Sequence, residues 1–144
     1  MSCVWIGLIK ALPSSEITEV LKLEESPTPK QFIKALKRHN VLTLGIAHHA
    51  VEADKDHQNR ILEDNEYQEN FNRIERISPK KLKKGYLCSG CDPLFFLIAY
   101  LFKYDIRHSF RGTCISYTCP NAKGMLVFGS NSYHFYYIRS ETYC

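Results

Sequence analysis

The stretch LCSGCDPLFFLIAYLFKYDIRH, residues 87–108, combines a pair of cysteines, a helix start and a run of nine apolar residues. The second cysteine, Cys91, is followed directly by Asp92 and Pro93. Aspartate is a favourable N-cap residue, and proline is favourable at the first position of a helix. The stretch therefore predicts a buried helix from Pro93 to about Lys103, with Cys91 just before its N-terminus.

Four short segments after this helix are rich in β-branched and aromatic residues, which favour strands. These segments are 106–110, 113–118, 125–128 and 133–138. Gly, Pro, Asn and Ser residues separate them, as in hairpin turns. The part of the chain from 78 to 144 is therefore predicted to be one cysteine-bearing helix packed on a small antiparallel β-meander.

The first part of the chain, residues 1–77, has mostly helical patterns. Ser14 or Ser15 can cap one helix, and Pro29 can begin another. A third helix, amphipathic and ending before Pro79, is indicated by the spacing of Tyr67, Phe71, Ile74 and Ile77. Other segments are expected to be a strand at 4–9, a buried strand at 41–47 and a polar loop or helical turn at 51–60. The fold class predicted for residues 1–144 is α+β in a single domain.

Composition indicates a globular protein, because 44% of the 144 residues are hydrophobic and 12% are aromatic. The longest apolar run is too short to cross a bilayer, so no membrane association is expected. No export signal is recognised at the start of the chain. The six cysteines are therefore expected to be reduced thiols in the cytoplasm rather than disulfides.

The formal net charge of +4 comes mainly from small basic clusters. The most compact is the group Lys80, Lys81, Lys83 and Lys84, just before the cysteine pair. Such a patch can bind nucleic acid or acidic partners, but lysines on a connecting segment are more often solvated surface. Nucleic acid is therefore not expected as a partner.

Cys91 has the position of a nucleophile. Backbone N–H groups and the positive end of the helix dipole favour the thiolate at such a position, and the same N–H groups can bind an oxyanion. A thiolate of this kind needs a histidine as its base. His134, at the start of the last predicted strand, is the first candidate, and His108, on the first strand of the meander, is its rival.

The segment from Cys91 to Phe102 resembles the Cys-x-Pro start and apolar central helix of papain-like cysteine peptidases. The likeness is greatest to the bacteriocin-processing and ovarian-tumour-type deubiquitinase branches, and His134-Phe135 is similar to their histidine-aromatic pair. The resemblance covers about the last 60 residues. It implies Cys91 as nucleophile, His134 as base, and the backbone N–H groups around Ser89–Cys91 as oxyanion hole.

The residue that would orient the imidazole is left open by the sequence. Phe135 and Tyr136 stand where those families have an Asn or Asp, so Asn131 or Asp105 could take the role, or the site could be a dyad. The resemblance implies a polypeptide substrate, including ubiquitin-like proteins, and no cofactor. A core this small would suit a viral or effector protein.

A structural zinc site is the alternative for the same thiols. Four cysteines in two close pairs can provide a tetrahedral set of ligands: Cys88, Cys91, Cys114 and Cys119. In that case the protein would be a small interaction module without catalysis. A third interpretation of Cys114 is a buried core residue, because free cysteine packs as a small hydrophobe.

The last predicted strand has an alternating pattern that assigns its two faces. Tyr133, Phe135 and Tyr137 should face the core. His134 and Ile138 then share the other face, where His134 could also be a hydrogen-bonded core histidine.

Overall fold

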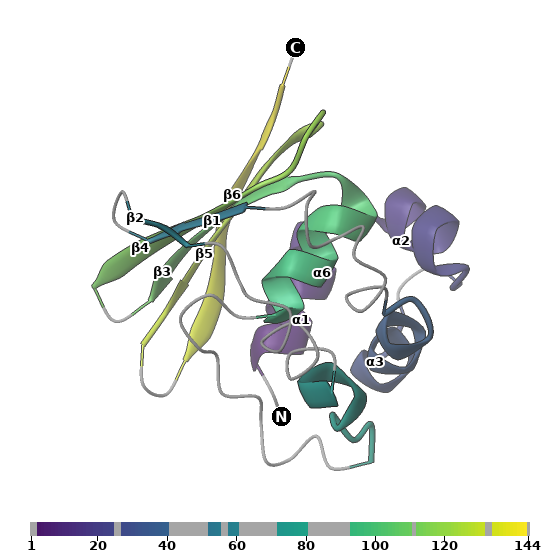
Figure 1. Ribbon diagram of the computed structural model, residues 1–144. Helices are drawn as coiled ribbons and strands as arrows, with labels where there is room; N and C mark the ends of the chain where they lie inside the picture. Colours follow the sequence, from purple (N-terminus) through teal and green to yellow (C-terminus); the bar gives the residue numbers. More distant parts are fainter. Residues whose placement is uncertain are drawn as a thin grey trace.

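The computed structural model describes residues 3–24, 27–40, 52–55, 58–60, 72–80, 93–110, 112–131 and 134–143 (Figure 1). The helices with assigned bounds are α1 (Cys3–Ala11), α2 (Ser14–Leu21), α3 (Pro29–Arg38) and α6 (Pro93–Phe102). The strands are β1 (Glu52–Lys55), β2 (Gln58–Arg60), β3 (Asp105–Phe110), β4 (Thr113–Thr118), β5 (Gly124–Ser130) and β6 (Phe135–Thr142). The α+β class is confirmed.

The opening segment is a helix, so the prediction of a strand at 4–9 was wrong. The buried hydrophobic residues of this segment and the turn after it are Val4, Trp5, Leu8, Ala11 and Leu12. Their separations of three and four residues match one helix face. A short run that is apolar almost throughout cannot be assigned from periodicity alone. The helix buries this face mainly against β6 and α3.

The second and third helices begin close to where the sequence places them. Thr28 caps α3 with a full capping box: its hydroxyl accepts from the Gln31 N–H, and the Gln31 side chain accepts from the Thr28 N–H. Helix α2 begins at Ser14, but its N-cap residue is Pro13, which offers no side-chain hydrogen bond. The expected serine cap is therefore wrong.

The six-stranded sheet is mixed, with the order β2-β1-β4-β3-β5-β6. The predicted antiparallel meander is correct for the β3–β4 and β5–β6 pairs, but β5 lies on the other side of β3 and runs parallel to it. The connection from β4 to β5 therefore crosses the start of β3. Hydrogen bonds from the Cys119 N–H to Asp105 and from the Lys123 N–H to the Lys103 carbonyl fix this crossing.

The polar segment at 51–60 contains β1 and β2, so the predicted loop or helical turn was wrong. Its residues show no alternation of apolar and polar side chains, which is the usual sequence evidence for a strand. Backbone pairing of β1 with β4 extends the sheet instead. The predicted strand at 41–47 lies outside the described residues.

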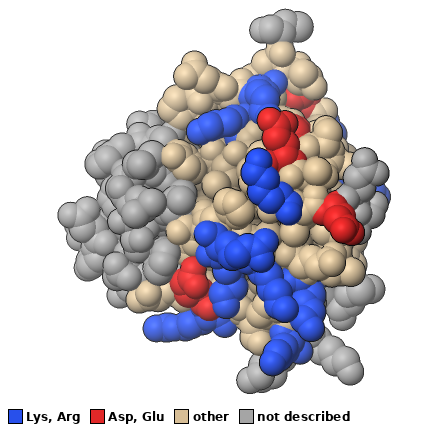
Figure 2. Space-filling view, turned by 90° about the vertical axis from the view of Figure 1, so that its right-hand side faces the viewer, with Lys and Arg blue, Asp and Glu red and all other residues tan. Residues whose placement is uncertain are grey.

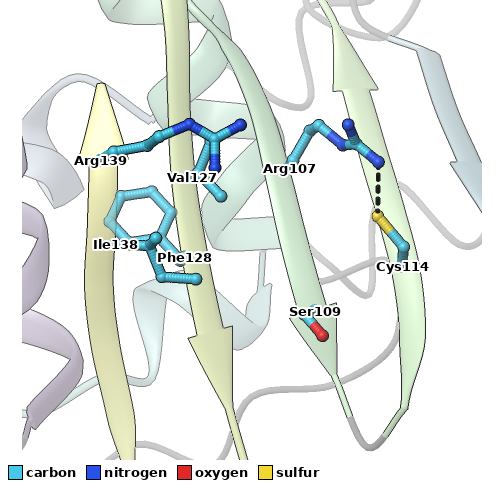
Figure 3. Close-up of a pocket in the computed structure, with 7 residues that line it drawn as sticks. All are labelled: Arg107, Ser109, Cys114, Val127, Phe128, Ile138 and Arg139. Carbon is cyan, nitrogen blue, oxygen red and sulfur yellow. Dashed lines mark hydrogen bonds between the residues drawn. The ribbon is translucent and has the colours of Figure 1, made fainter. Parts of the chain in front are cut away.

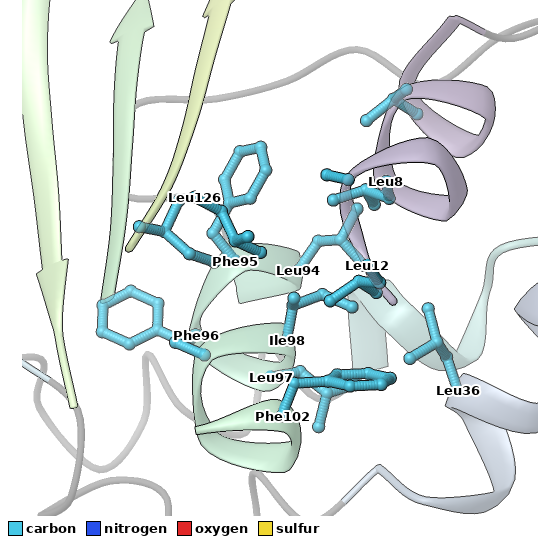
Figure 4. Close-up of a cluster of buried hydrophobic side chains, with 14 of the residues drawn as sticks. Leu8, Leu12, Leu36, Leu94, Phe95, Phe96, Leu97, Ile98, Phe102 and Leu126 are labelled. Atoms are coloured by element: carbon cyan, nitrogen blue, oxygen red, sulfur yellow. The ribbon is translucent and has the colours of Figure 1, made fainter. Parts of the chain in front are cut away.

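Helix α6 lies between the sheet and helices α2 and α3, whereas α1 packs directly against β6 (Figures 1 and 4). Phe95 and Phe96 point toward the sheet, whereas Leu94 lies beside Leu8 and Leu12 (Figure 4). All five side chains are essentially inaccessible to solvent. One hydrophobic core therefore joins the helical first part of the chain to the sheet.

The amphipathic helix predicted to end before Pro79 is described only in part. A helical turn occupies residues 72–75, and Ile74 is buried in the core. Tyr67 and Phe71 lie outside the described residues. Within the described part of the chain, the helices are too short or too polar to cross a membrane.

Candidate functional site

The first turn of α6 and the start of β6 are in contact. The rings of Phe95 and Phe135 stack with their centroids 6.0 Å apart and an angle of 16° between their planes. Cys91 stands two positions before α6 in the sequence, and His134 immediately precedes Phe135. Cys91 itself lies outside the described residues. The fold thus brings together the two elements that flank the predicted nucleophile and base.

His134 is exposed at the end of the sheet and is held through its backbone. Its N–H donates to Oδ1 of Asn131 over 2.9 Å, and the Asn131 N–H donates to the His134 carbonyl, also over 2.9 Å. Its imidazole stacks on the ring of Tyr136, with 5.7 Å between centroids and 21° between planes. The structure therefore places two of the predicted site residues together. The interpretation of His134 as a core histidine is wrong, because the residue is exposed.

His108, the rival base, is buried in the core. Its exposed fraction is 0%, and its Nε2 lies 2.7 Å from Oγ of Ser130. Rings of Phe95, Phe110 and Phe135 surround it at centroid distances of 4.7, 5.6 and 5.8 Å. Burial lowers the pKa of His108 to about 4, so its ring is neutral at pH 7. Among the described residues, no partner binds its buried Nδ1.

Asp105 lies at the wrong end of the sheet to orient His134. Its two carboxylate oxygens accept hydrogen bonds from the Cys119 N–H (2.9 Å) and the Tyr143 hydroxyl (2.8 Å). It pairs with the start of β5, whereas Phe135 pairs with the end of β5. Strand β5 spans about 20 Å at roughly 3.3 Å per residue. Of the two proposed orienting residues, the fold places only Asn131 next to His134.

The four-cysteine zinc site is not supported by the two cysteines that the structure describes. Cys114 is near the start of the extended strand β4 and Cys119 is just past its end, so their backbones are about 16 Å apart. Two sulfurs on one zinc ion, each about 2.3 Å from it, lie within about 5 Å of each other. In the described ranges, no group of three His, Cys, Asp or Glu residues could hold a metal. Cys88 and Cys91 are outside those ranges.

Cys114 is half-buried rather than part of the core, and burial instead occurs at Cys119. Burial also raises the pKa of the Cys119 thiol. The guanidinium of Arg107 donates to the Cys114 sulfur over 3.4 Å on the sheet face away from α6 (Figure 3). The interpretation of Cys114 as a core residue is therefore wrong.

A hollow of about 260 Å³ lies on this outer face of the sheet (Figure 3). Its lining residues are Arg107, Ser109, Cys114, Val127, Phe128, Ile138 and Arg139. A β-bulge opposite Val127 and Phe128 makes Ile138 the extra residue of β6. Sequence reasoning missed this hollow, because it depends on β3 and β5 being neighbours and on the bulge.

Gly129 is expected to control the position of Tyr136 and, through it, of His134. The two residues are partners in the β5–β6 register, and a Cβ on Gly129 would lie only 2.6 Å from the tyrosine ring. We expect Gly129→Ala to displace this ring, to shift the NMR signals of the His134 imidazole and to lower the free energy of unfolding by about 1–3 kcal/mol. Adding Tyr136→Ser should recover much of the stability loss. Unchanged His134 signals and stability in Gly129→Ala would contradict this expectation.

No protein-family model, curated protein or solved structure matches this chain, so its functional site rests on its own geometry.

Proposed function

We propose that this protein is a cysteine peptidase or isopeptidase of papain-like type, with Cys91 as nucleophile and His134 as base. The contact between Phe95 and Phe135 is the observation that carries the proposal. It brings the start of the helix that follows Cys91 to the start of the strand that follows His134. Papain-like catalysis requires such a meeting of a helix N-terminus with a strand-borne histidine.

The exposure of the two histidines supports His134 rather than His108 as the base. A base that protonates a leaving amine must reach the substrate, and His134 is exposed at the end of the sheet. His108 is enclosed by aromatic rings and bonded to Ser130. Asn131 is then a positioning residue, because it fixes the backbone of His134.

In the proposed reaction, the Cys91 thiolate attacks the carbonyl carbon of a peptide or isopeptide bond. The His134 imidazolium gives its proton to the amine nitrogen as the C–N bond breaks, which leaves a thioester on Cys91. His134 then accepts a proton from water, the hydroxide oxygen attacks the thioester carbonyl, and the carboxylic acid and the thiol are released. No cofactor takes part.

Site-resolved alkylation tests the proposal without a known substrate. With iodoacetamide near pH 6.5, we expect Cys91 to react at least about tenfold faster than the half-exposed Cys114, because only an activated thiol is ionised at that pH. His134→Ala should remove most of this difference. His39→Ala, which deletes an imidazole from the end of α3, should leave it intact. Equal and slow reaction of the two thiols would overturn the proposal.

The substrate class proposed for the site is polypeptide, including ubiquitin-like proteins. Ubiquitin with an electrophile at its C-terminus should form a covalent adduct with the wild-type chain and none with Cys91→Ser. If short peptide electrophiles label Cys91 and this probe does not, the peptidase chemistry stands and the ubiquitin-like substrate is wrong.

A further inference from the structure

One face of the protein carries a concentration of positive charge that the sequence divides between two distant segments. Seven of the eight charged side chains on α3 and on residues 72–80 are basic. We call these seven the basic face: Lys30, Lys34, Lys37, Arg38, Arg73, Arg76 and Lys80. Figure 2, which views the side of the molecule where α2 and α3 lie in Figure 1, shows Lys and Arg side chains gathered over its lower half.

Two hydrogen bonds join the segments of this face. Nζ of Lys37 donates to the Ile77 carbonyl over 3.1 Å, and the Asn40 side chain donates to a carboxylate oxygen of Glu75 over 3.2 Å. Glu75, the single acidic residue of the two segments, is thereby engaged. On the inner side of α3, Phe32 and Leu36 are buried in the core, so the basic residues must lie toward solvent.

Helix stability does not account for these charges. Lys37 and Arg38 lie in the last turn of α3, where the helix dipole favours cations. Lys30 is in the first turn, where the dipole disfavours them, and both Lys30 and Lys34 are exposed. Arg76 and Lys80 are also exposed. A surface that repels itself in this way is typical of a site for a polyanion.

The described residues of the basic face include no large exposed apolar side chain, and this indicates which kind of polyanion the face binds. The large hydrophobic residues that are exposed in the described part of the chain are Ile6, Tyr136, Ile138 and Tyr143, and none of them is on α3 or residues 72–80. Protein interfaces have an apolar core, and membrane-binding surfaces insert apolar anchors. Contacts to nucleic-acid phosphates need neither.

We infer that the basic face binds the phosphate backbone of nucleic acid without reading its sequence. The inference is independent of the proposed peptidase chemistry. It differs from the expectation of a solvated surface because the fold combines two basic segments on one face.

Fluorescence anisotropy with a labelled single-stranded RNA of about 24 nucleotides tests the inference. Each phosphate contact on a single strand adds about −0.7 to the slope of log affinity against log salt, so four contacts would give a slope near −3. The double variant Lys34→Gln/Arg76→Gln should then bind at least tenfold more weakly near 0.1 M salt, because each lost contact costs about fivefold there. Its slope should also become shallower by about 1.4.

The matched control is Arg107→Gln/Arg139→Gln, which removes the same charge from the outer face of the sheet. It should bind RNA nearly as well as the wild type, and Lys34→Arg/Arg76→Lys should retain binding. Equal losses in the two Gln variants, or loss in the charge-preserving variant, would overturn the inference. Unlabelled RNA should displace the labelled RNA far better than poly-glutamate or phosphatidylserine vesicles at matched charge. Equal displacement by either of these competitors would also overturn the inference.

Discussion

Phe95→Ala is expected to lower the free energy of unfolding by about 3–5 kcal/mol, the largest effect of any single side chain near the site. Phe95 has an exposed fraction of 0%. Its ring lies within 6.0 Å of the rings of His108, Tyr117, Phe128 and Phe135. Removing it would leave a cavity between α6 and four strands, which rigid aromatic neighbours on several sides cannot close.

Urea unfolding of the wild type, Phe95→Ala and Phe95→Leu measures this effect. Leucine keeps much of the apolar volume, so its loss should be clearly smaller than that of alanine. Phe95→Ala should also slow the alkylation of Cys91 in molecules that remain folded, because the start of α6 loses its contact with β6. A loss below about 1.5 kcal/mol for Phe95→Ala would mean that the aromatic cluster does not hold α6 on the sheet.

The elements that the sequence predicted well are those with strong local chemistry. Asp92-Pro93 and the apolar run after it gave the start of α6, and Pro29 gave the start of α3. Runs of β-branched and aromatic residues gave β3 and β4, and alternation gave the buried side of Phe135 and the exposed side of Tyr136 at the start of β6. Tyr133, the first residue of that pattern, lies outside the described residues. In each case, the residues that form the element also specify it.

The arrangement of these elements depends on contacts between distant residues, and the sequence did not give it. Strand β5 pairs with β3 rather than with β4, a choice fixed by backbone hydrogen bonds and not by side-chain pattern. Strand β1 has no apolar alternation, so its backbone pairing with β2 and β4 identifies it. Helix α1 is apolar on most sides, so its sequence shows no clear helical periodicity.

The same distinction applies to the candidate site. The sequence proposed His134 from its place at the start of a strand and Asn131 as one of two residues that could orient it, and the structure puts these two in one turn. It could not separate an exposed histidine from a buried one, because exposure depends on the neighbouring strands. His108 is buried because rings from α6, β3 and β6 enclose it, and the end of β5 brings Ser130 to its Nε2.

His108 is expected to make the fold sensitive to acid. Its pKa is about 4 in the folded chain, compared with an ordinary value of 6.5, because burial penalises the charged ring. The unfolded chain therefore binds a proton more readily between these two values. The contribution of His108 to the free energy of unfolding is therefore complete above pH 6.5. It falls by about 3 kcal/mol as the pH drops toward 4, because each unit of pKa difference corresponds to about 1.4 kcal/mol.

The comparison of the wild type with His108→Gln isolates this contribution from those of the carboxylates. Glutamine can still hydrogen-bond Ser130 but does not titrate. Between pH 7 and pH 4, the free energy of unfolding of the variant should therefore fall by roughly 3 kcal/mol less than that of the wild type. The aromatic and hydrogen-bonding neighbours of the His108 ring in the described structure are Phe95, Phe110, Phe135 and Ser130, and none of these four carries a charge that could offset a proton. Because the measured quantity is the change with pH, a variant that is less stable at pH 7 still answers the question. If the free energy of unfolding of the two proteins changes in parallel with pH, then water or another group reaches His108. The conclusion that aromatic rings shield its ring from water would then be wrong.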